Sequence, residues 1–236
     1  MDLKAKLKDS LISETWAVVP SEIVQSITQR AFLWTWWITA IVFAVAYYIV
    51  WMIKWWAIDP NQYIIAFWVS ALAWLWLVVA ISLWYQKMSY GTLSILTILF
   101  AIAEWVWLAG ILSVYNASSV INAFAWAALL FVVMWVYGYV TKTDLTKFSS
   151  ILFVWLITLI ILELVNMFIG SSQLDMILSA VWVLLFMWIT AWDLQMLKMM
   201  AATWDRRLEL VFWVSLYLDF INIFLMLLRI FGSRND

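Results

Sequence analysis

The stretch VSLYLDFINIFLMLLRIFG, Val214–Gly232, is strongly apolar and holds a single acidic residue, Asp219. It lies in a segment, 208–231, that meets the length of about 20 residues needed for a membrane-crossing helix. Ser215, Asp219 and Asn222 are spaced i, i+4 and i+7, which places them on one face of a helix. The stretch therefore predicts a membrane helix that turns a polar face inward.

The composition of the whole chain agrees with this. Residues of the types AVILMFWYC make up 68% of the 236 residues, and charged residues make up 11%. Soluble domains are usually about 45–50% apolar and about 25% charged, so the soluble classes are nearly excluded. The absence of Cys and His excludes disulfides, the usual zinc ligands and Ser-His-Asp hydrolases.

Several function classes are also disfavoured. The formal net charge of -1 gives no basic footprint, so no nucleic-acid partner is expected. No nucleophile–base set, cofactor motif or Gly-rich phosphate loop is visible, so we expect neither an enzyme nor a bound cofactor.

Charged residues divide the chain into apolar lengths that can each cross a bilayer. Seven spans are expected, at about 31–53, 61–86, 90–112, 119–140, 148–169, 174–197 and 208–231. They form one membrane domain, 31–232, with a polar or amphipathic segment, 1–30, before it and a tail, 233–236, after it. The predicted fold class is an all-α integral membrane protein with seven transmembrane helices.

The distribution of Lys and Arg predicts the orientation. Ten of the 13 lie on the side that holds the N-terminus and the second, fourth and sixth loops, so the N-terminus is expected in the cytoplasm. The C-terminus is then outside if the last segment crosses fully, and inside if that segment is re-entrant. A prokaryotic cytoplasmic membrane is expected, because the chain is compact and its first residues do not resemble a targeting segment.

Four acidic residues fall within the expected spans: Glu104, Glu163, Asp193 and Asp219. An unpaired charge at the centre of a spanning helix costs roughly 2.5–3.5 kcal/mol. The default interpretation of such a residue is therefore functional. The alternative is a protonated carboxyl that forms a structural hydrogen bond between helices.

Asp193 and Asp219 form the most informative pair. Each is 13 positions from Arg206, which lies in the polar turn between the last two spans. Residues equidistant from the turn of an antiparallel hairpin lie at similar height, so the two carboxyls should meet if they share a face. Adjacent carboxylates cannot easily both ionise and tend to share a proton. Such a pair can titrate near neutral pH without histidine, and we predict that it has a functional role.

The other polar residues receive weaker predictions. Glu104 lies in the middle of its span, whereas Glu163 shares a stripe with Asn166 nearer the outer end. All three are expected to support the ion pathway. Asp175 is expected to be a solvated end of the sixth span, and Tyr217 an anchor at the membrane interface.

The stretch Val214–Gly232 closely resembles the signature of the transmembrane Bax-inhibitor-motif family. Ala103-Glu104-Trp105 resembles the family's A/L-E-G, and YGYVTKTDL at Tyr137–Leu145 resembles its Y-G-Y-x-T-K-x-D-L. Leu164–Ile169 and Ile189–Asp193 are similar to its fifth and sixth spans. The resemblance covers most of the chain beyond the second span.

The resemblance implies a seven-helix fold with the last helix central, and a pH-sensitive calcium leak. In that family an aspartate pair matching Asp193 and Asp219 controls the pore, and the third-span Glu matches Glu104. The family commonly has an Arg near the end of its second helix that latches the pair. This chain has WYQK at 84–87 instead, so Lys87 is the possible latch cation, as a point charge rather than a fork.

Calcium favours oxygen ligands, which Asp193, Asp219, Asn222 and Asn166 supply. A leak needs only weak sites, so Ca²⁺ is expected as the permeating ion with transient contacts at the two aspartates. One alternative is a regulatory membrane protein that binds partners such as a membrane protease or cell-death machinery. Another is a proton-coupled carrier, although no inverted repeat is obvious. The expected partners are the lipid bilayer, calcium ions and other membrane proteins.

The chain has 21 Trp and only 5 Gly. Trp105, Trp155, Trp182 and Trp188 resemble positions where the family has Gly. Glycine lets helices approach closely, whereas tryptophan would overpack such a contact. We interpret many of these tryptophans as glycines in the living protein. Their UGA codons are read as Gly in some genetic codes and as Trp in another, and translation with the wrong code would give Trp. The alternatives are a genuinely Trp-rich chain and a designed one.

Overall fold

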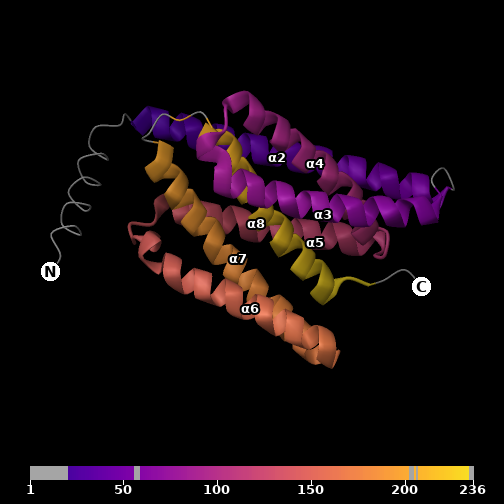
Figure 1. Cartoon of the computed structure of the whole chain (residues 1–236). Coiled ribbons are helices and arrows are strands. Elements are labelled where there is room, and N and C mark those ends of the chain that lie inside the picture. Colours follow the sequence, from indigo (N-terminus) through magenta and orange to yellow (C-terminus); the bar gives the residue numbers. More distant parts are fainter. Residues whose placement is uncertain (1–20, 56–58, 202–204, 206, 234–236) are drawn as a thin grey trace.

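The computed structural model describes residues 21–55, 59–201, 205 and 207–233, and the described part contains helices and no strand. Seven helices in it are long and apolar enough to cross a membrane, which confirms the predicted fold class (Figure 1). They are α2 (Ser21–Lys54), α3 (Pro60–Trp84), α4 (Tyr90–Leu112), α5 (Ala117–Val140), α6 (Ser149–Ile169), α7 (Ser172–Ala201) and α8 (Arg207–Phe231). Two short 3₁₀ helices, η1 (Tyr85–Lys87) and η2 (Leu145–Phe148), complete the described elements.

The two ends of the chain are described only in part. Residues 1–20 of the expected polar segment and residues 234–236 of the expected tail lie outside the described residues. Helix α2 begins at Ser21, ten residues before the expected first span.

Local capping explains where several helices begin and end. The Ser89 side chain accepts a hydrogen bond from the Thr92 amide at 3.1 Å and so caps α4. Asn116 caps α5 in the same way, at 2.9 Å from the Ser119 amide. Helix α6 ends at Gly170, whose φ of 69° is the left-handed conformation that glycine adopts without strain.

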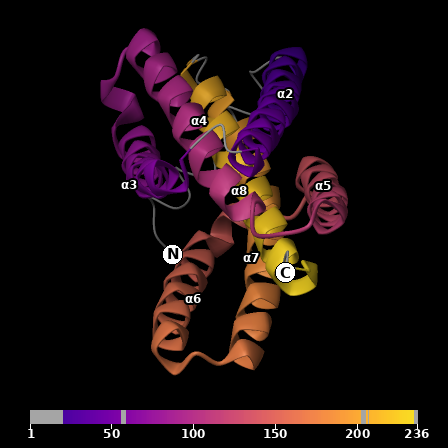
Figure 2. The same cartoon turned by 90° about the vertical axis from the view of Figure 1, so that its right-hand side faces the viewer.

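Helix α8 is the centre of the bundle. It packs against α7, α5, α2, α4 and α3, and Figure 2 shows it running between them. In the apolar stretch of α8, 61% is buried inside the protein, whereas 6% is buried in the span that contains α6. The prediction that the last helix is central is confirmed.

Helix α8 also runs the full length of the bundle. At its start, Arg207 Nη1 donates to the Gln86 carbonyl at 2.8 Å, in the α3–α4 connection. Just after its end, the Ser233 amide donates to Ser119 Oγ at 2.9 Å, next to the α4–α5 connection. These two connections lie at opposite ends of α4, so α8 is not re-entrant. We call the two ends of the bundle the Arg207 end and the Ser233 end.

Helix α6 is the most peripheral span. It packs against α7 and η2, and the α6–α7 hairpin projects away from the other helices (Figure 2). Leu159 and Asn166 are its only buried residues among those described. Most of its other residues are apolar and exposed, as expected for a helix that faces lipid chains.

Candidate functional site

Asp193 of α7 and Asp219 of α8 lie together inside the bundle. Their exposed fractions are 4% and 3%, so both carboxyls are removed from solvent and from lipid. The two groups are close enough for the charge of Asp193 to act on Asp219. The antiparallel packing of α7 on α8 therefore brings together the pair that spacing from Arg206 predicts.

Hydroxyl groups surround the pair. Ser215 Oγ donates a hydrogen bond to Asp193 Oδ2, and the Thr190 side chain lies beside Asp219. The Thr190 hydroxyl donates its hydrogen bond to the Phe186 carbonyl of the same helix, at 2.8 Å.

No cation among the described residues pairs with either aspartate. Within the described ranges, no ion pair involves Asp193 or Asp219, and Asp219 Oδ2 has no hydrogen-bond partner. Burying two adjacent negative charges without a counter-charge is costly. The packed arrangement consequently favours a pair that retains at least one proton.

The three polar residues on one face of α8 do not all contact the aspartate pair. Ser215 and Asp219 both belong to the pair, whereas Asn222 Nδ2 donates to the Leu218 carbonyl of its own helix at 2.7 Å. Asn222 therefore satisfies its donor within α8 rather than at a carboxyl.

Contacts to the α5–α6 connection hold α7 in place near Asp193. Gln195 Nε2 donates to the Thr143 carbonyl at 2.8 Å, and Gln195 Oε1 accepts from the Leu145 amide at 2.9 Å. Lys198 Nζ donates to the Tyr139 carbonyl and lies 4.0 Å from the centroid of the Tyr139 ring, a cation–π contact. Sequence reasoning missed Gln195 and Lys198, because their partners are backbone atoms about 50–60 positions away.

A close approach of α5 and α7 lies beside these contacts. A Cβ atom on Gly138 would fall 2.8 Å from Ala191 Cα, so only glycine fits this position. Small residues permit such approaches between membrane helices. The YGYVTKTDL motif at Tyr137–Leu145 thus forms the surface on which the Asp193 segment of α7 rests.

Glu104 of α4 packs against a face of α8 other than the one that carries Asp219. Its carboxyl is fully buried, and Tyr217 Oη donates to Glu104 Oε1 at 3.0 Å. The expectation that Tyr217 is an interfacial anchor is wrong: α8 is central, so its tyrosine is buried too. Glu104 Oε2 has no hydrogen-bond partner, and the nearby Trp74 indole is not placed to bond with it.

Glu163, Asp175 and Asn166 gather at the Ser233 end. Arg229 Nε donates to Asp175 Oδ2 at 2.8 Å, and Arg229 Nη1 donates to Glu163 Oε1 at 3.1 Å. The expectation that Asp175 is merely solvated is therefore wrong, because α8 brings a guanidinium to it. Asn166 exchanges two hydrogen bonds with the Ser171 backbone, both at 3.2 Å, and holds the α6–α7 turn.

Lys87 lies exposed in η1. Across the described part of the chain, Lys87 takes part in no ion pair. The cation that binds this turn is Arg207, which contacts the Gln86 and Met88 carbonyls and pairs with Asp205 at 2.7 Å. Hydrogen bonds from Arg207 lower the pKa of Asp205, which lies outside the spans. The latch role of Lys87 stays a prediction.

No cluster of three or more acidic side chains able to hold a metal ion occurs among the residues whose structure is described. Calcium at Asp193 and Asp219 stays a prediction of transient contacts, made by an ion in passage.

The four tryptophans that resemble family glycines fall into two groups. Trp155 and Trp188 are 54% and 44% exposed, so overpacking does not apply to them. Trp182 is buried and stacks on Phe186 with ring centroids 5.5 Å apart. Trp105 packs against the core, and its buried indole N–H has no acceptor.

Comparisons with known proteins agree with the resemblance. The model of a family described as "Inhibitor of apoptosis-promoting Bax1" matches residues 24–236. The inner membrane protein YbhL of Escherichia coli is 39% identical over 163 residues, which cover 66% of this chain and 70% of that protein. An uncharacterised protein of Borreliella burgdorferi is 40% identical over the same length and the same shares. A third relative, from Rickettsia prowazekii, is 36% identical over 157 residues, covering 64% of this chain and 66% of that protein.

Proposed function

This chain belongs to the family described as inhibitors of apoptosis-promoting Bax1, and on that premise we propose that it is a calcium leak channel gated by the protonation of Asp193 and Asp219. It is a membrane protein with a relative in a bacterial inner membrane. The observation that carries the proposal is the buried pair between α7 and the central helix α8, which has hydroxyls beside it and no ion pair with any described cation.

The proposed mechanism follows from charge. With one proton or two, the pair is at most singly charged, and α7 and α8 pack closely around it. When the last proton leaves, two buried carboxylates repel each other at close range. The repulsion separates the two helices at this level and presents oxygen ligands of the kind that Ca²⁺ prefers.

The sign of the pH response depends on whether a cation pairs with the ionised aspartates. Such a cation would stabilise the closed state at high pH. The charge that acts on Asp219 is that of Asp193, and Arg207 is engaged with Asp205. Because no described cation pairs with the aspartates, ionisation opens the proposed channel, so calcium flux rises with pH.

Calcium flux into proteoliposomes tests the proposal. The wild-type flux should rise with pH, and the Asp193→Asn/Asp219→Asn double variant should lose this dependence. Asp144→Asn, an acid outside the spans, is the matched control and should respond to pH like the wild type. A pH response retained by the double variant would reject the gate.

Binding of a protein partner is the second candidate, favoured by the printed description of the family as inhibitors of Bax1. Cross-linking in native membranes distinguishes it from a leak. A protein captured in stoichiometric amount, together with proteoliposomes that pass no calcium, would favour this candidate. We place the protein in a prokaryotic cytoplasmic membrane with its N-terminus in the cytoplasm, as the Lys and Arg distribution predicts.

A further inference from the structure

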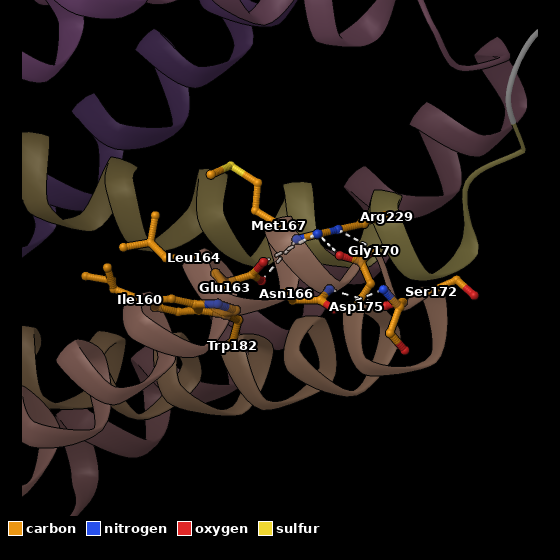
Figure 3. Close-up of a pocket in the computed structure, with 11 residues that line it drawn as sticks. Ile160, Glu163, Leu164, Asn166, Met167, Gly170, Ser172, Asp175, Trp182 and Arg229 are labelled. Atoms are coloured by element: carbon orange, nitrogen blue, oxygen red, sulfur yellow. Dashed lines mark hydrogen bonds and ion pairs between the residues drawn. The ribbon is translucent and has the colours of Figure 1, made fainter.

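A cavity of about 600 Å³ lies at the Ser233 end, between α6, α7 and the last turn of α8 (Figure 3). It is separate from the Asp193–Asp219 pair, and none of its lining residues belongs to that pair. One end of the cavity is charged and the other is apolar. A cavity with one charged and one apolar end fits an amphipathic molecule.

The charged end is built around Arg229. Its guanidinium lies between Glu163 of α6 and Asp175 of α7, as Figure 3 shows. Four contacts with these carboxylates leave one of the five guanidinium N–H donors free. The carboxylates keep unused lone pairs, and two negative charges face one positive charge.

The hydroxyl of Ser172 and the N-terminus of α7 border the same end. The amides at a helix N-terminus point outward and favour an anion. The charged end thus offers acceptors to a cation at the carboxylates, and donors to an anion at Arg229 and the start of α7.

The deeper, apolar end consists of Ile160 of α6 and Trp182 of α7, and Leu164 and Met167 of α6 add apolar surface beside the charged groups. Met167 is 69% exposed and Leu164 is 52% exposed, so this wall opens sideways from the bundle. In a membrane protein, that direction leads to the lipid chains.

The depth of the cavity matches the two layers of a bilayer leaflet. At 1.5 Å per residue, Glu163 lies about 9 Å and Ile160 about 13 Å from the end of α6 at Ile169. The headgroup layer on each side is about 5–8 Å thick. The charged end therefore lies near headgroup level, and Ile160 and Trp182 lie deeper, in the hydrocarbon.

We propose that this cavity binds a phospholipid whose headgroup carries a primary ammonium. The ammonium binds Glu163 and Asp175, the phosphate binds the free N–H of Arg229 and the start of α7, and one acyl chain follows Ile160 and Leu164. The excess negative charge of the lining selects against an anionic headgroup. A choline headgroup has no N–H donor and binds more weakly. The site is independent of any ion flux.

Lipid retention by the purified full-length protein tests this site. The protein is exchanged into nanodiscs or mixed micelles holding phosphatidylethanolamine, phosphatidylcholine and phosphatidylglycerol with identical acyl chains in equal amounts. Native mass spectrometry then counts the retained lipids. Phosphatidylethanolamine should be retained about tenfold over each of the others, which corresponds to one charge-assisted hydrogen bond.

Two variants probe the two ends separately. Glu163→Gln keeps the size of the side chain but removes a charge, and should abolish the preference over phosphatidylcholine. Ile160→Trp fills the apolar end, leaves the ion pairs intact, and should lower retention of all three lipids. Asp59→Asn, an acid elsewhere at the Ser233 end, is the matched control and should keep the wild-type preference.

Four results would overturn the proposal. The first three are equal retention of phosphatidylethanolamine and phosphatidylcholine by the wild type, preferential retention of phosphatidylglycerol, and an unchanged preference in a folded Glu163→Gln variant. Displacement of the lipid by soluble phosphoethanolamine at equal concentration would also overturn it, because the site would then take a free zwitterion rather than a lipid.

Discussion

Tyr217 and Glu104 are 113 residues apart and meet in a fully buried hydrogen bond between α8 and α4, 3.0 Å from Oη to Oε1. The bond joins the central helix to a neighbour on a face that does not contain Asp219. It satisfies one carboxyl oxygen and leaves the other, Oε2, without a partner. Helix α8 therefore carries a buried polar contact on each of two faces, and its rotation about its own axis is restricted by both.

Removing the tyrosine hydroxyl should destabilise the bundle. Tyr217→Phe leaves the Glu104 carboxyl with no hydrogen bond, which costs about 1–3 kcal/mol for a buried polar group. Thermal unfolding in detergent should show a clear fall in Tm. Glu104→Gln retains an acceptor for Tyr217 and should lose less. Equal stability of Tyr217→Phe and the wild type would show that the bond contributes nothing.

The two hydrogen bonds of Gln195 should position α7. Gln195→Ala removes both contacts with the α5–α6 connection, at about 0.5–1.5 kcal/mol each. Hydrogen exchange at the Leu145 amide should become faster, because that amide loses its acceptor. Gln195→Glu keeps the acceptor and loses the donor to Thr143, so the Leu145 amide should stay protected. If both variants exchange equally, the contact does not order the connection.

Acidification should release the Asp205–Arg207 contact at the Arg207 end. Hydrogen bonds from Arg207 hold the pKa of Asp205 below its usual value. A carboxyl with a lowered pKa in the folded state stabilises that state above its unfolded pKa, near 4. This contribution is lost as the pH falls through the lower, folded-state pKa. The Tm of Asp205→Asn should lie below that of the wild type at neutral pH, by at most a few degrees, and the two should converge in acid.

The absence of cysteine makes the orientation directly measurable. Ser233→Cys and Gln86→Cys place single thiols at opposite ends of the bundle. In intact cells, an impermeant thiol reagent should label Ser233→Cys and spare Gln86→Cys, because the Lys and Arg distribution predicts that the Arg207 end is cytoplasmic. The opposite labelling pattern would reverse the orientation.

The coding DNA should contain UGA at buried tryptophan positions. Trp105 and Trp182 are the sharpest tests, because both pack inside the bundle. Among the described residues, five buried indole N–H groups have no acceptor, which is also costly: those of Trp74, Trp105, Trp135, Trp192 and Trp213. UGG at positions 105, 182 and 188 would reject the misread-glycine interpretation. Exposed residues such as Trp155 carry less weight, since the structure accommodates them.

The sequence predicted the aspartate pair because both residues are equidistant from one turn, and a short hairpin converts sequence distance into height. It did not predict the roles of Arg229, Gln195 or Tyr217. Each of these binds a partner more than 45 residues away on another helix. The spacing within a helix indicates which residues share a face, but not which neighbour that face meets.

The amino-acid sequence by itself determined that the chain crosses a membrane seven times and where the spans lie, because in lipid each apolar segment must satisfy its own backbone hydrogen bonds as a helix. It also determined the relative height of Asp193 and Asp219. Only the tertiary structure decided that Tyr217 is buried against Glu104 and that Arg229 closes the charged end of a lateral cavity. Helix packing depends on the shapes of all faces together, and lipid-facing and protein-facing apolar residues look alike in sequence.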